Sequence, residues 1–111
     1  MEIVKRITKG PYKSLLGSLT ISLAVYEYYY RHVKVGITGD PDVRAIAHQA
    51  DGWQRMVVRY VTSSRDVANS IEKHFILTRP ELKNKWTGFS HMTKTGPYYV
   101  YFLMKTRRRL Q

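Results

Sequence analysis

The chain has no cysteine among its 111 residues. This absence excludes a disulfide framework and any metal site built on thiolates. The chain also lacks an apolar run near the roughly 20 residues that a membrane-spanning helix needs. Its first residues, MEIVKRITKG, carry charges where a secretory signal peptide would be apolar. These absences predict an intracellular protein, cytoplasmic or, if it is eukaryotic or viral, nuclear.

Acidic residues are scarce. Eight Asp and Glu face 19 Lys and Arg, which gives a formal charge of +11 and a pI near 10.1. A domain this basic usually binds a polyanion, and nucleic acid is the commonest one. The alternative interpretation is a basic surface kept for solubility. We therefore expect a nucleic-acid partner, DNA rather than RNA, and no membrane partner.

The length suits one domain with one core, and a hydrophobic content of 43% is typical of a folded protein. We expect a single domain over 1–111, with its core at about 19–84. A last strand at 98–104 and a basic tail at 105–111 would follow. The order of the expected elements indicates an α+β fold, a small antiparallel sheet of three or four strands flanked by helices.

The stretch KVGITGDPDVRAIAH has the clearest local signals. It predicts a strand at 33–38, a glycine turn and a helix at 41–50. Asp40 suits the N-cap of that helix and Pro41 its first turn. Arg44 and His48 would then lie one turn apart on the same side. Four residues at helical spacing would form the apolar stripe of this helix: Val43, Ile46, Ala47 and Ala50.

Residues 19–31, LTISLAVYEYYYR, are rich in β-branched and aromatic side chains. This composition favours a strand, joined to the strand at 33–38 by a tight hairpin at Arg31 and His32. Alternation would place Tyr26, Tyr28 and Tyr30 on one face of that strand.

Further along, 53–61 is expected to form a strand and 65–77 a helix capped by Ser63 or Ser64. The apolar stripe of this helix contains Val67, Ala68, Ile71, Phe75 and Ile76. Glu72 lies beside the stripe, where a carboxylate needs a metal or an arginine unless it reaches water. Residues 80–97 are expected to form an ordered loop.

These features together resemble the GIY-YIG nuclease superfamily, especially its phage and viral branch with Lys-Ile-Gly as the second motif. AVY at 24–26 stands in the place of GIY, and KVG at 34–36 stands in the place of YIG. Arg44 matches the helix arginine that follows the second motif. The run TSSRDVANSIE, which ends at Glu72, is similar to the helix that supplies the glutamate of the family.

The resemblance implies a nuclease that depends on Mg²⁺ or Mn²⁺. Glu72 would be the metal ligand, and Arg44 would bind the scissile phosphate. Tyr26 would act as the general base toward the attacking water. His48 and Asn84 would support the site. A carboxylate suits the hard Mg²⁺ ion, and a cation at the phosphate stabilises the transition state.

Two positions depart from the motifs of the family. The first glycine is Ala24, and the second tyrosine is Lys34. Lys34 could contact a phosphate or take part in proton transfer instead. Because three tyrosines share the expected face, Tyr28 or Tyr30 could replace Tyr26 as the functional phenol.

The expected function is therefore a divalent-metal-dependent endonuclease acting on DNA. The alternative is a non-catalytic nucleic-acid-binding module on the same fold, and a third interpretation is an RNA-associated structural protein. The expected substrate-binding cations are Lys105, Arg107, Arg108 and Arg109. Trp53 and Trp86 could stack on bases, although Trp53 at a strand start suits core packing. A chain of this size could also act as a homodimer.

Overall fold

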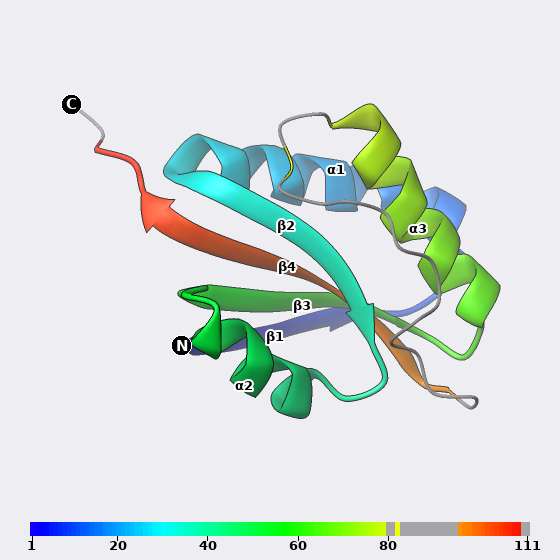
Figure 1. The fold of residues 1–111 in the computed structure, drawn as a ribbon. Coiled ribbons are helices and arrows are strands. Elements are labelled where there is room, and N and C mark those ends of the chain that lie inside the picture. Colours follow the sequence, from blue (N-terminus) through cyan, green and yellow to red (C-terminus); the bar gives the residue numbers. More distant parts are fainter. Residues whose placement is uncertain (80–81, 83–95, 110–111) are drawn as a thin grey trace.

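The computed structural model describes residues 1–79, 82 and 96–109. Most of the segment that was expected to form a loop, including Asn84 and Trp86, lies outside these residues. Within them, helices and strands alternate along the chain (Figure 1). Their order is β1 (Glu2–Thr8), α1 (Tyr12–Tyr29), β2 (Tyr30–Thr38), α2 (Pro41–Ala50), β3 (Arg55–Thr62), α3 (Arg65–Thr78) and β4 (Tyr98–Arg107). No described helix is long and apolar enough to cross a membrane.

The four described strands form one sheet in the order β1-β3-β4-β2. β4 pairs antiparallel with β2 on one side and with β3 on the other. β1 pairs parallel to β3. The expected α+β class is confirmed, but the sheet is mixed rather than purely antiparallel. The difference arises at β1, which joins the edge beside β3 and runs in the same direction.

The helices divide between the two faces of the sheet. α1 and α3 cover one face and α2 covers the other (Figure 1). Along β4, Val100, Phe102 and Met104 face the larger core beneath α1 and α3. Tyr101 and Leu103 face the smaller core on the α2 side. From Val100 to Met104, the side chains of β4 therefore face the larger and the smaller core in turn.

The expected strand at 19–31 and its hairpin are wrong. These residues lie mostly in α1, and Arg31 and His32 already belong to β2. Leu19, Leu23 and Tyr26 recur at helical spacing and pack against the sheet, where both leucines are fully buried. This burial outweighs the β-propensity of the tyrosines and β-branched residues between them.

Helix α2 has the expected bounds and cap. The Asp40 carboxylate accepts hydrogen bonds from the backbone N–H groups of Asp42 and Val43 at 3.1 and 3.2 Å. The expected apolar stripe is wrong, because Val43 is 62% and Ile46 is 72% exposed. The helix instead buries Pro41, Ala45 and His48. This rotation directs His48 toward the sheet, where it is hydrogen-bonded.

The remaining expectations agree with the structure more closely. The strand expected at 53–61 is β3, and the helix expected at 65–77 is α3. The Ser64 hydroxyl caps α3 by accepting from the backbone N–H of Val67 at 3.2 Å. Ala68, Ile71 and Phe75 are buried as the stripe predicted. β4 continues to Arg107, so the first residues of the expected tail are part of a strand.

Candidate functional site

Tyr101 stands at the centre of the candidate site, on the central strand β4. Its antiparallel partner on the edge strand β2 is Gly36. A Cβ atom at Gly36 would overlap the Tyr101 ring at its Cζ and hydroxyl atoms. Only glycine therefore lets this ring lie so close to the backbone of β2. Gly36, the glycine of the KVG motif, therefore makes room for the phenol ring of Tyr101.

His48 and Arg44 on α2 both contact that phenol. The Nε2 atom of His48 lies 2.8 Å from the Tyr101 hydroxyl, and His48 is 3% exposed. The side chain of Arg44 also hydrogen-bonds to Tyr101. A guanidinium group only donates, so the Tyr101 oxygen is the acceptor of that bond. The phenol proton can then point to Nε2 of a neutral His48.

The charges around Tyr101 act in opposite directions. Burial raises the pKa of Tyr101 to about 12. The positive charge and the hydrogen bond of Arg44 lower this pKa, whereas the carboxylate of Glu72 raises it. Tyr101 is therefore a neutral phenol at pH 7. Charged groups of both α2 and α3 affect its pKa.

Glu72 reaches the same region from α3. Burial raises the pKa of Glu72 to about 7, and the nearby charge of Lys34 opposes this rise. Lys34 lies on β2, two residues before Gly36. Its neighbours Val33 and Val35 face the core beneath α1 and α3, so Lys34 projects toward the α2 side. α2 and α3 thus approach the edge strand from opposite faces of the sheet.

Glu72 is the carboxylate of this region that could hold a divalent metal. In the part of the chain that the structure describes, no three His, Asp or Glu side chains cluster as metal ligands. Mg²⁺ is commonly bound by one or two carboxylates, with water and substrate phosphate as its other ligands. Glu72 supplies one carboxylate. The buried Nε of Arg44 has no hydrogen-bond partner among the described residues.

The structure does not bring the expected phenols into this site. Tyr26 lies on α1 against Phe102, with ring centroids 5.6 Å apart. Phe102 belongs to the larger core, on the face of the sheet opposite Tyr101. Tyr30 packs in the same core, and Tyr28 is exposed on α1. Because 19–29 is helical, these tyrosines do not share one strand face. The tyrosine beside His48 and Arg44 is Tyr101, which sequence reasoning missed.

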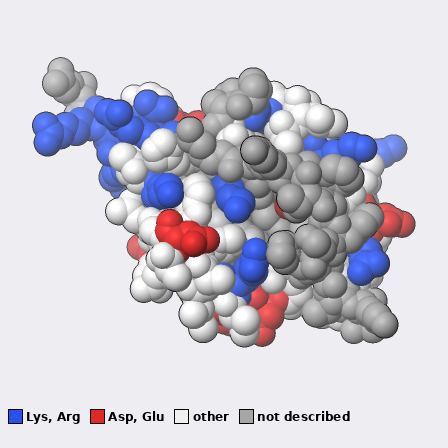
Figure 2. All heavy atoms as spheres, viewed as in Figure 1, with Lys and Arg blue, Asp and Glu red and all other residues white. Residues whose placement is uncertain are grey.

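The expected substrate-binding cations lie at one end of the sheet. Lys105 lies four residues after Tyr101 on β4 and shares its face. Thr106 has a φ of 63° and interrupts the alternation. The Arg107 guanidinium instead lies 5.8 Å from the centre of the Tyr30 ring, which belongs to the larger core. The Lys105 ammonium lies 4.6 Å from the centre of the Trp53 ring, which is 8% exposed. Trp53 is therefore a core residue covered by a lysine. Figure 2 shows basic side chains gathered where the chain leaves β4, with others across the same face.

The raised pKa of Glu72 predicts a pH-dependent stability. Between its ordinary pKa of 4.5 and about 7, the folded chain holds a proton that the unfolded chain releases. The free energy of unfolding should therefore fall as the pH rises through this range. Glu72→Gln removes the charge and keeps the shape. We expect this variant to exceed wild type by about 1 kcal/mol at pH 8, a value reduced for partial exposure, and to match it at pH 4.

Urea denaturation at pH 4 and pH 8 measures this difference. Asp66→Asn, which removes an exposed carboxyl at the start of the same helix, is the matched control. A gain for Glu72→Gln at pH 8 that is no larger than the gain for Asp66→Asn would contradict burial as the cause.

Comparisons with known proteins returned no match. No protein-family model matches the chain, and no curated protein or solved structure does so. The site is therefore interpreted from its own residues and their geometry.

Proposed function

We propose that this chain is a divalent-metal-dependent endonuclease that cleaves DNA phosphodiester bonds. The observation that carries the proposal is the convergence on Tyr101 of groups from three other elements. His48 and Arg44 of α2 hydrogen-bond to its hydroxyl. Gly36 of β2 accommodates its ring, and Glu72 of α3 perturbs its pKa. A phenol, a guanidinium, an imidazole and a carboxylate are the groups that metal-assisted phosphodiester hydrolysis needs.

Each side chain has a distinct role in the proposed reaction. Arg44 binds a non-bridging oxygen of the scissile phosphate and stabilises the charge that develops there. Tyr101 takes a proton from the attacking water while its own proton moves to Nε2 of His48. Glu72 would hold Mg²⁺ or Mn²⁺, and the bound metal would polarise the phosphate. Lys34, beside Glu72, adds positive charge for the substrate.

The resemblance to the GIY-YIG superfamily supports this proposal, although the strand that would carry the phenol stands at a different place along this chain. The antiparallel neighbour of the KVG strand is β4, and Tyr101 lies opposite Gly36. The AVY segment at 24–26 is helical and cannot fill that place. We therefore assign the role of the first motif to Tyr99-Val100-Tyr101. The strand that carries the phenol follows the glutamate helix in this chain, instead of preceding the KVG strand.

The second candidate is a nucleic-acid-binding module without catalysis. The observation that favours it is the high pKa of Tyr101, which keeps the phenol neutral at pH 7. The ordered cations of β4 would then bind phosphates through charge alone. Such binding would weaken with salt and would not need a metal.

Plasmid nicking separates the two candidates. Wild type should nick supercoiled plasmid in Mg²⁺ and not in EDTA. Glu72→Gln should nick at least about a hundredfold more slowly than wild type, because the proposed metal ligand is lost. Asp66→Asn on the same helix should keep the wild-type rate. Equal rates for wild type and Glu72→Gln would contradict the assigned site. Salt-sensitive binding without nicking by wild type would support the binding module.

A further inference from the structure

Exposed aromatic rings lie among arginines where α1 passes into β2. Tyr28 is 61% and Tyr29 is 36% exposed, and their rings meet edge to face at 5.0 Å. The Arg107 guanidinium lies 5.5 Å from the centre of the Tyr29 ring. None of these residues takes part in the contacts around Tyr101. A group of exposed aromatic rings is a common mark of an interaction site.

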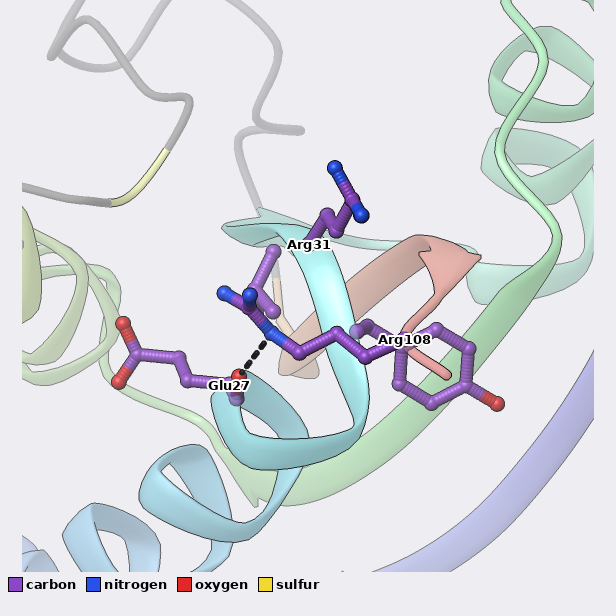
Figure 3. Close-up of a pocket in the computed structure, with 5 residues that line it drawn as sticks. Glu27, Arg31 and Arg108 are labelled. Carbon is purple, nitrogen blue, oxygen red and sulfur yellow. Dashed lines mark hydrogen bonds between the residues drawn. The ribbon is translucent and has the colours of Figure 1, made fainter. Parts of the chain in front are cut away.

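A small hollow beside these rings is lined by two further arginines, Arg31 and Arg108 (Figure 3). The Nε of Arg108 donates to the Glu27 carbonyl oxygen at 3.2 Å, and its backbone N–H donates to the Tyr29 carbonyl oxygen at 2.7 Å. Figure 3 shows the Glu27 carboxylate turned away from Arg108.

That carboxylate is already neutralised by another residue. The Nε of Arg79 donates to it at 3.0 Å. Arg31 and Arg108 are therefore not neutralised by this carboxylate, and their positive charge can attract a ligand. Guanidinium groups in such a setting suit phosphate oxygens, which they bind with directed hydrogen bonds.

The strand β4 connects this surface to the candidate site. Arg107 lies six residues after Tyr101, which at the rise of a strand corresponds to about 20 Å. Lys105 lies between them along β4, and His32 of β2 is its antiparallel partner. Lys105 and Arg107 thus place positive charge along β4 between Tyr101 and the exposed rings.

We propose that the surface formed by Tyr28, Tyr29, Arg31, Arg107 and Arg108 binds a single-stranded flank of the DNA substrate. The inference rests on the proposed function and specifies its substrate class. A tyrosine ring can stack on a base only when the face of that base is not already covered by its neighbours in a duplex, so the tyrosines favour a single strand over a duplex. The arginines bind the phosphates that join the stacked bases. The substrate is thereby DNA with an unpaired extension or branch beside the cleaved bond.

Fluorescence anisotropy in EDTA tests the role of the rings. The probes are a labelled DNA single strand of mixed sequence and a duplex of the same length. Tyr28→Ala should weaken binding of the single strand about tenfold, as the loss of one stacked base does, and should change duplex binding less than twofold. Tyr28→Phe should keep wild-type affinity. Ile21→Ala, which truncates a side chain of α1 that is 68% exposed, is the matched control.

A second variant tests the arginines. Arg108→Gln should weaken binding of both probes and lower the slope of log affinity against log salt by about one. Lys13→Gln, an exposed cation at the other end of α1, should leave the affinity and the slope unchanged. An unchanged slope for Arg108→Gln would show that Arg108 does not contact a phosphate, which would contradict the proposal.

The outcomes separate this inference from the proposed nuclease. No binding of the single strand by wild type overturns the inference. Equal losses on both probes for Tyr28→Ala, or a loss no larger than that of Ile21→Ala, overturn it as well. If wild type does not nick plasmid but shows the expected binding pattern, the surface stands and the nuclease fails. If wild type nicks and Tyr28→Ala binds normally, only the surface fails.

Discussion

Tyr101→Phe should slow plasmid nicking by about 10²- to 10⁴-fold, the usual contribution of a positioned proton-transfer group. Phenylalanine keeps the ring that packs on Gly36, so the fold should remain. The variant loses the hydroxyl that meets His48 at 2.8 Å and accepts from Arg44. Its free energy of unfolding should change by about 1 kcal/mol, the net value of an ordinary hydrogen bond. Single-turnover nicking and urea denaturation measure the two effects.

Tyr26→Phe is the matched control for this variant. It removes the same atom from a tyrosine on the opposite face of the sheet, where the ring packs on Phe102. We expect it to nick at a rate within about threefold of wild type, because a residue away from the reacting groups has no transition-state contact to lose. A large loss in Tyr26→Phe with a normal rate in Tyr101→Phe would return the phenol assignment to α1.

Gly36→Ala should damage both stability and activity. The added methyl group would overlap the end of the Tyr101 ring, and overpacking of this kind costs about 1 to 3 kcal/mol. The ring can escape only by leaving the contacts with His48 and Arg44. Nicking should therefore fall about as far as in Tyr101→Phe. Denaturation in urea and the nicking rate again provide the measurements.

A double-mutant cycle shows whether the overlap is the cause. Gly36→Ala should cost little stability in a Tyr101→Ala background, because the overlapping atoms are gone. Gly17→Ala provides a second comparison. Gly17 lies within α1, and a Cβ atom there would meet no atom within 4 Å. That change should stabilise the chain by about 0.5 to 1 kcal/mol. Equal costs for Gly36→Ala with and without the Tyr101 ring would contradict the proposed contact.

The sequence predicts a helix or strand correctly where the residues that determine it lie close together in the chain. Asp40 and Pro41 mark the start of α2, and the Ser64 hydroxyl caps α3. The aromatic and apolar run at 98–104 predicts most of β4 correctly. In each case the evidence lies within a few residues of the element, so the sequence alone could place it.

Distant packing decided the remaining features. The tyrosine-rich stretch forms α1 because Leu19 and Leu23 are buried against a sheet whose strands lie far along the chain. The face that α2 buries depends on the hydrogen bond between His48 and Tyr101, 53 residues apart. Sequence patterns report local preference and not the register of distant strands, so the phenol of the site could not be identified in advance.

The site cannot exist until β4 has been made. Within the described part of the chain, β2 has no strand neighbour except β4, and β4 also carries Tyr101. On the ribosome, α2 and α3 emerge with Arg44, His48 and Glu72 before the strand that unites them. Pairing of residues some 70 positions apart is slow to form, because a long loop must close first. We therefore expect a nascent chain that stops before Tyr98 to lack the proposed nuclease activity, because it lacks the strand that joins the proposed site.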